Sequence, residues 1–247
     1  MTTAPPEISP KPTLLAELAK QLRTRGYAIL NSASVCEWAS CSIDELNQMK
    51  TSWNEMPVDQ YLKDGGKYRK RRHSSFKFGN ETLNFAPHRA HWQPLTYNAL
   101  HGGMTRWFEP MPASITALPA WQKLLAVFAK TANQLNAGTQ CIEAHQFRIE
   151  ALEGGIGRPT PEGAHRDGVD LVGVFMVSRR NIKGGETRVF EASGSSGERF
   201  TLQEPWSLLL LDDAKVVHET TPIQPLTTSG HRDTLVLTAK QGRFLEP

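Results

Sequence analysis

The chain has 247 residues, of which 39% are apolar and 21% are charged. This composition is typical of a folded globular protein and excludes a disordered or fibrous chain. Lysine and arginine exceed aspartate and glutamate by 28 − 25 = 3, an imbalance too small to indicate nucleic-acid binding by itself.

The chain has no run of about 18 apolar residues, and its polar, proline-rich start does not resemble a signal peptide. Its three cysteines, Cys36, Cys41 and Cys141, form no CxxC pair. An odd number without such a pair favours a reducing compartment and argues against a zinc site built from cysteine. We therefore expect a cytoplasmic protein without a membrane partner.

The N-terminal half contains three predicted helices and one strand. Leucines at helical spacing followed by Gly26 predict an amphipathic helix over residues 12–26, and a strand follows at 27–30. Ser42 precedes Glu45 by three residues, a capping-box pattern that predicts a helix to about residue 55. A third helix is predicted over 119–135. Residues 57–113 show no clean period, and we expect long ordered loops there.

From about residue 140 the chain changes to short runs rich in valine, isoleucine, leucine and threonine, separated by glycine and proline. The predicted strands cover residues 141–150, 169–179, 187–191, 207–212, 216–220 and 234–239. We expect one domain over residues 1–247, with 1–10 flexible and 11–139 a helical, loop-rich support. Residues 140–241 would form a β-sandwich or open barrel of the jelly-roll type.

A metal site is predicted from His165, Asp167 and His218. The first two lie two residues apart before an apolar strand, so in extended backbone both side chains point to one face. His218 follows 218 − 165 = 53 residues later, within β-like sequence. Two imidazoles and one carboxylate bind one face of an octahedral iron(II) and leave three positions open. A lone HxD pair, by contrast, is more often a turn or a hydrogen-bonded pair.

Arg232 and Thr234 are predicted to share one face of a strand beyond His218. A guanidinium binds a carboxylate through two hydrogen bonds, and a threonine hydroxyl can add a third. This pair would suit the distal carboxylate of 2-oxoglutarate. The alternative is a surface arginine paired with Asp233 or Asp213.

With these motifs the sequence resembles the 2-oxoglutarate and iron(II) dependent dioxygenases, whose fold is the double-stranded β-helix. The resemblance covers residues 141–240, through the HRD at 165–167, the glycine turn at 183–186, His218, and Arg232 with Thr234. More narrowly, the basic segment 68–72 and the Gln146-Phe-Arg148 strand resemble a bacterial group that contains free L-isoleucine hydroxylases and biofilm stress and motility proteins.

The resemblance implies an enzyme that uses Fe(II), 2-oxoglutarate and dioxygen, and that releases succinate and CO2. Its substrate would be a small molecule, with a free L-amino acid the leading candidate. A peptide or another metabolite stays open, as does a cupin-like stress or biofilm regulatory protein that binds metal without turnover. Homodimer formation stays open as well.

A free amino acid needs a cation for its carboxylate and an acidic or carbonyl partner for its ammonium group. We favour Arg148, Gln146 and Glu143 on one predicted strand, although Arg148 could equally point to solvent. Further basic candidates come from the loops: Arg69, Arg71, Arg72 and Arg106.

The basic run 67–72 could also indicate nucleic acid, but a solvated loop is the more usual explanation, so we expect no nucleic-acid partner. The six other histidines are expected to be ordinary surface or hydrogen-bonded residues: His73, His88, His91, His101, His145 and His231.

Overall fold

A computed structural model describes residues 8–194 and 196–247. Most of the expected flexible N-terminus, residues 1–7, lies outside this part. Just after it, Ile8 is docked, because its carbonyl accepts a hydrogen bond from Thr201 N at 2.8 Å.

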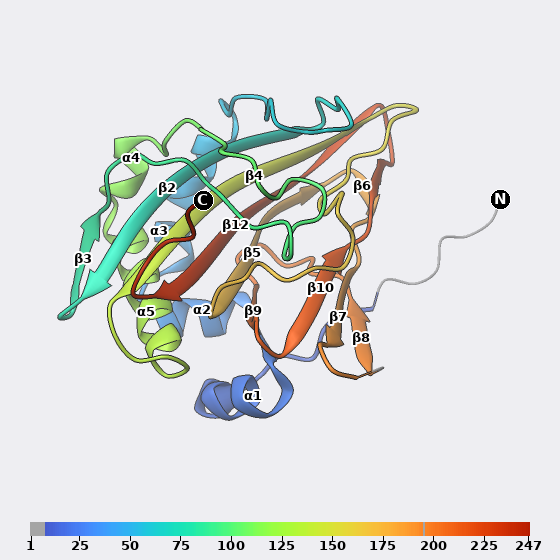
Figure 1. Cartoon of the computed structure of the whole chain (residues 1–247). Coiled ribbons are helices and arrows are strands. Elements are labelled where there is room, and N and C mark those ends of the chain that lie inside the picture. The colour runs from blue at the N-terminus through green and yellow to red at the C-terminus, as the bar shows by residue number, and fades with distance from the viewer. Residues whose placement is uncertain (1–7, 195) are drawn as a thin grey trace.

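The main sheet is antiparallel and has seven strands in the order β1-β9-β5-β12-β4-β2-β3. The last strand of the chain, β12, therefore lies in the middle of the sheet (Figure 1). The bounds are Tyr27–Leu30 (β1), Leu208–Asp212 (β9), Leu171–Arg180 (β5), Ser229–Gln241 (β12), Gln140–Leu152 (β4), Arg69–Gly79 (β2) and Thr82–Phe85 (β3).

A smaller set of strands faces this sheet. It contains a three-stranded sheet in the order β10-β7-β8 and the pair β11-β6. The bounds are Val216–Thr220 (β10), Thr187–Glu191 (β7), Gly197–Phe200 (β8), Ile223–Pro225 (β11) and Ile182–Gly184 (β6). The predicted double-stranded β-helix, with helices added at its N-terminal side, is confirmed.

The helices pack on the opposite face of the main sheet (Figure 1). They are α1 (Leu18–Arg25), α2 (Ser32–Ala39), α3 (Ile43–Asn47), α4 (Ala113–Thr116) and α5 (Pro119–Asn133). The capping box at Ser42 and Glu45 is present, with backbone-to-side-chain hydrogen bonds of 2.7 and 3.1 Å. Sequence reasoning missed α2, which Asn31 caps by accepting from Ser34 N at 2.8 Å. No helix in the described ranges is both long and apolar enough to cross a membrane.

Strand β9 shows how two cores share the main sheet. Leu208 and Leu210 pack with the helices, whereas Leu209 and Leu211 pack with the smaller sheet. This alternation follows from the two-residue period of a strand that is buried on both faces. In β12, the same period points Leu235 into the helical core. The neighbouring even-numbered side chains therefore face the smaller sheet.

Residues 57–113 contain more regular structure than expected. The basic run at 67–72 enters β2, which pairs with β4 over ten residues, beginning at Arg69 opposite Ile149. Arg69 and Arg71 are buried, so this run is not simply a solvated basic loop. The segment after β3 folds back on itself, with an isolated antiparallel bridge between His91 and Arg106.

Candidate active site

The structure brings His165, Asp167 and His218 together. Two backbone hydrogen bonds, of 3.1 and 3.0 Å, join His165 to His218 of β10. The two ring centroids are 4.7 Å apart, and His218 Nε2 lies 3.9 Å from Asp167 Oδ2. One ligand atom from each side chain lies within 4.8 Å of the others, as a shared metal ion requires.

Each histidine directs one ring nitrogen toward the shared site, and Glu162 Oε1 lies 3.7 Å from His165 Nε2. His165 Nδ1 lies 2.9 Å from Gly163 O, so it carries the proton and leaves Nε2 as the lone-pair donor. Burial lowers the pKa of His218 to about 3, and the nearby His165 imidazole adds to this. His218 is therefore neutral at ordinary pH, which is the form that binds metals.

The turn that carries Asp167 is held by Asp213, which sits between β9 and β10. Its carboxylate accepts backbone N–H groups from Asp167, Gly168 and Val169 at 2.9, 2.8 and 3.2 Å. Burial raises the pKa of Asp213 to about 6, and the Asp167 carboxylate adds to this. Asp213 is thus occupied by backbone, and it is not a partner of Arg232.

A cavity lies beside the triad, between the main sheet and the smaller one. Two groups of side chains line it together with His165, Asp167 and His218. One group is Arg232, Thr234 and Val236 of β12, and the other is Arg71, Arg106, His91, His145 and Glu162. The triad and the predicted carboxylate clamp therefore open into one space.

Arg232 is buried, with 3% of its surface exposed, and points into this cavity. Its Nε and Nη2 atoms have no hydrogen-bond partner within the described ranges. Burial lowers the pKa of Arg232 to about 10, and Arg179 contributes, so the guanidinium stays protonated at neutral pH. Its sequence neighbour Asp233 instead receives two hydrogen bonds from Arg148, at 2.8 and 2.7 Å. Arg232 is thus a buried cation prepared for an anion.

Gln93 was not identified from the sequence, yet it connects the metal side of the cavity to the loop. Its Nε2 donates to Asp167 Oδ1 at 3.1 Å, and its Oε1 accepts from Asn98 and Arg106 at 3.2 and 3.1 Å. Gln93 therefore orients Asp167 and Arg106 together. No local motif marks this glutamine, because its partners are distant in the chain.

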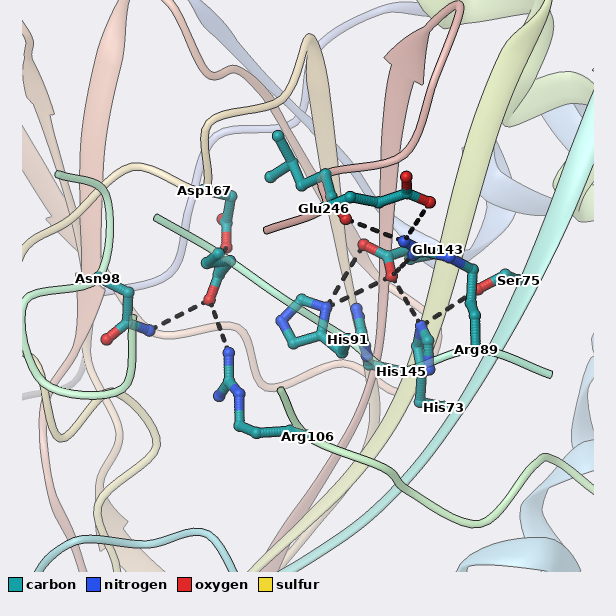
Figure 2. Close-up of polar contacts among 12 residues, drawn as sticks. His73, Ser75, Arg89, His91, Asn98, Arg106, Glu143, His145, Asp167 and Glu246 are labelled. Atoms are coloured by element: carbon teal, nitrogen blue, oxygen red, sulfur yellow. Dashed lines mark hydrogen bonds and ion pairs between the residues drawn. The ribbon is translucent and has the colours of Figure 1, made fainter. Parts of the chain in front are cut away.

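A second cluster, made of His73, His91, Glu143 and His145, also has the composition of a metal site. Its carboxylate is surrounded by hydrogen-bond partners, as Figure 2 shows, whereas His73 Nδ1 has no partner among the described residues. His73 Nε2 and Arg89 Nη1 each lie 2.9 Å from Glu143 Oε1, and His91 Nδ1 lies 3.4 Å away. Burial alone would raise the pKa of Glu143, but the His91 and His73 imidazoles hold it well below its usual range. An ionised Glu143 paired with Arg89 makes a structural network.

The three residues favoured for substrate binding lie on different faces of β4, because side chains alternate along a strand. Glu143 belongs to the network beside the cavity, whereas Arg148 and Gln146 point to the other face of β4 and do not line the cavity. Gln146 Nε2 donates to Ser52 Oγ at 2.6 Å, and Arg148 is occupied by Asp233. Arg72 donates to the Ser52 and Glu55 carbonyls, while Arg71 and Arg106 line the cavity.

Comparison with solved structures agrees with this architecture. The chain is 48% identical to a bsmA homolog from Methylobium petroleophilum PM1, with a TM-score of 0.91 and coverage of 97% of this chain and 98% of that one. IDO from Bacillus thuringiensis is similar in fold at 16% identity, with a TM-score of 0.73 over 92% of this chain and 98% of that one.

The Fe(II)/α-ketoglutarate-dependent dioxygenase TqaL is likewise 16% identical, with a TM-score of 0.70 over 92% of this chain and 86% of that one. No protein with a curated description matches the sequence. Residues 50–238 match the model of the 2OG-Fe dioxygenase family, whose members use Fe(II), 2-oxoglutarate and dioxygen. The chain belongs to the 2OG-Fe dioxygenase family.

Proposed function

We propose that this protein hydroxylates a free L-amino acid, with conversion of 2-oxoglutarate to succinate and CO2. His165, Asp167 and His218 would hold Fe(II), and Arg232 with Thr234 would bind the distal carboxylate of 2-oxoglutarate. The observation that carries the proposal is Arg232, a buried cation in the cavity of the triad, two of whose donor atoms have no partner in residues 8–194 and 196–247. A protein that only stored metal would have no use for it.

The donor set fits the group that the family uses. Two neutral imidazoles and one carboxylate suit Fe(II) and leave coordination positions for an oxoacid and dioxygen. Fe(II) with 2-oxoglutarate and dioxygen supplies the oxidation of an unactivated C–H bond. The chain supplies orientation: Gly163 O fixes the ring of His165, Gln93 fixes Asp167, and Asp213 fixes the turn between them.

The enclosure of the cavity supports a small substrate. The loop from 86 to 112 closes over it and places His91, Gln93 and Arg106, each at most 6% exposed, against the strands. Such a wall excludes water and favours a small molecule over a protein side chain on a folded surface.

The test is to incubate the iron-loaded protein with 2-oxoglutarate and a panel of free L-amino acids, and to measure succinate and a mass gain of one oxygen. We expect at least one amino acid to stimulate succinate formation and to gain oxygen. Replacing His165 or Asp167 by alanine should abolish iron binding, whereas Arg232→Ala should mainly raise the KM for 2-oxoglutarate. Iron binding without succinate under any condition would instead support a regulatory metal-binding protein.

A further inference from the structure

Two of the arginines that line the cavity form no ion pair among the described residues. Arg71 of β2 is 4% exposed and Arg106 of the covering loop is 2% exposed. Neither forms an ion pair with a carboxylate in residues 8–194 or 196–247, and the Nε atom of each lacks a hydrogen-bond partner there. The third arginine nearby, Arg69, is different, because its Nε binds Asp59 Oδ2 at 2.8 Å.

Both unpaired guanidinium groups are held in place. Arg71 lies between the rings of Phe108 and Phe147, with its Cζ 4.2 and 4.7 Å from their centroids. Arg106 donates to Gln93 Oε1 at 3.1 Å, which ties it to the residue that orients Asp167. Fixed cations of this kind lose little conformational entropy when they bind a carboxylate.

His145 adds a third donor to the same region. Its Nδ1 lies 3.1 Å from Arg71 Nη2. Because a guanidinium can only donate, His145 Nδ1 is the acceptor and Nε2 carries the proton. Arg71, Arg106 and His145 therefore all present N–H donors, a composition that selects an anion.

Glu162 supplies a charge of the opposite sign. It lines the same cavity, and its side chain is 12% exposed. Its Oε1 lies 3.7 Å from His165 Nε2, whereas its Oε2 is buried with no hydrogen-bond partner among the described residues. A carboxylate oxygen in that situation suits a positively charged group on a ligand.

We propose that Arg71 and Arg106 bind the carboxylate of the substrate and that Glu162 binds its ammonium group. This assignment rests on the proposed oxygenase function and makes the recognised substrate a free α-amino acid, read at both charged groups. Arg232 remains for 2-oxoglutarate. The carboxylate of the cosubstrate and the carboxylate of the amino acid therefore have separate cationic sites.

The test uses the 20 standard L-amino acids, their α-carboxamides and the matching carboxylic acids without the amine. Binding is measured calorimetrically to the Fe(II) and 2-oxoglutarate form under anaerobic conditions, where no turnover occurs. KM values for succinate formation are then measured in air. For the amino acid that binds best, we expect the carboxamide to bind about 10 to 100 times more weakly.

The protein variants are Arg71→Lys, Arg106→Lys and Glu162→Gln, with Arg72→Lys as the matched control. Arg71→Lys and Arg106→Lys should each raise the KM for the amino acid about 10-fold or more, and the KM for 2-oxoglutarate far less. Glu162→Gln should weaken binding of the amino acid but should leave binding of its amine-free analogue unchanged. Arg72→Lys should change neither KM, because Arg72 binds backbone carbonyls away from the cavity.

The outcomes separate this inference from the proposed function. Equal binding of acid and carboxamide, or no binding by any carboxylate while 2-oxoglutarate is still converted to succinate, would overturn the carboxylate site. Absence of succinate under every condition would overturn the oxygenase function, and the anaerobic titration would still test Arg71 and Arg106. The carboxamide comparison uses unaltered protein, so a variant that fails to fold does not affect it.

Discussion

Asp213 shows how one buried carboxylate organises the proposed metal site without being one of its three proposed ligands. It accepts three successive N–H groups from the turn after His165. Asparagine has one acceptor oxygen and would turn an NH2 group toward those donors. We expect Asp213→Asn to weaken metal binding about 10- to 100-fold, measured by titration with Fe(II) under anaerobic conditions.

The matched control is Asp212→Asn, one residue earlier. The Asp212 carboxylate accepts a hydrogen bond from Ala214 N and forms an ion pair with the exposed Lys215, and it holds none of the three N–H groups that Asp213 binds. Its replacement should leave the affinity for the metal within twofold of that of the unaltered protein. Equal losses in the two variants would mean that Asp213 acts through general stability instead of the turn.

Buried neutral histidines make the metal-free protein sensitive to acid. Burial lowers the pKa of His91 and of His218 to about 3, whereas unfolded histidine titrates near 6.5. Between these values the unfolded chain binds protons that the folded chain excludes, so stability falls as the pH falls. Each histidine should cost at most about 2 kcal/mol between pH 7 and pH 5.

Urea denaturation of the metal-free protein at a series of pH values would measure this effect. His91→Asn removes one of the titrating groups and should give a shallower decline of the free energy of unfolding below pH 6.5. A decline as steep as that of the unaltered protein would show that His91 is not responsible.

At the residue scale, the site residues that could be predicted from the sequence are those with a regular local spacing. The HxD pair, the distal His218 and the Arg232 with Thr234 pattern are regular enough to be read directly, and the structure gathers all of them at one cavity. Gln93 and Arg106 come from a loop without a period. Their role depends on contacts made only after the loop crosses the sheet.

At the element scale, β4 explains why the favoured substrate residues lie elsewhere. Apolar residues occupy even positions early in the strand, at Ile142 and Ala144, and odd positions later, at Phe147 and Ile149. Helices cover the first pair, while the second pair lines the cavity. The sequence alone therefore does not indicate whether the odd-numbered or the even-numbered residues of β4 face the cavity. The prediction based on Gln146 and Arg148 chose the even-numbered face, whereas His145 lies on the odd-numbered face.

The strand elements were predicted best where apolar runs were short and bounded by turns. Tyr27–Leu30, Thr187–Glu191 and Val216–Thr220 have the expected bounds. β2 was missed because its first half, Arg69–His73, is basic, and burial of such residues depends on partners such as Asp59 that lie outside the strand.

The contact between α5 and the main sheet depends on Gly173 of β5. A methyl group there would lie 2.9 Å from Phe128 Cε2 and 3.4 Å from Leu208 Cδ1, closer than the packed core allows. We expect Gly173→Ala to lower the free energy of unfolding by about 1 to 3 kcal/mol. Chemical denaturation would measure this.

The cost should shrink when Phe128 is replaced by leucine, because the smaller side chain leaves room for the added methyl group. A double-mutant cycle over Gly173→Ala and Phe128→Leu isolates this coupling. Additive effects of the two substitutions would contradict the proposed close contact.

At the scale of the whole molecule, Arg89 joins its own loop to two distant segments, β4 and residues 244–245. It pairs with Glu143 of β4 at 2.9 Å, donates to Leu245 O at 2.9 Å, and lies 4.3 Å from the centroid of the Phe244 ring. Arg89→Met would leave the Glu143 carboxylate buried without a full positive charge. We expect a loss of about 3 kcal/mol in the free energy of unfolding.

Lys130→Met provides the control for this prediction. Lys130 forms an ion pair with Glu81 in which both side chains are more than half exposed. Such a pair contributes little, so the change should stay below about 0.5 kcal/mol. A similarly small effect of Arg89→Met would show that the histidines alone satisfy Glu143.

The central position of β12 also governs how the chain folds. This last strand pairs over its length with β4 on one side and along much of it with β5 on the other, so neither neighbour can complete its hydrogen bonding earlier. During synthesis, the edges of β4 and β5 stay open until residues 229–241 leave the ribosome. Refolding should accordingly be slow, with a rate set by closure of long chain loops. The chain is therefore most vulnerable to aggregation until residues 229–241 are available to pair.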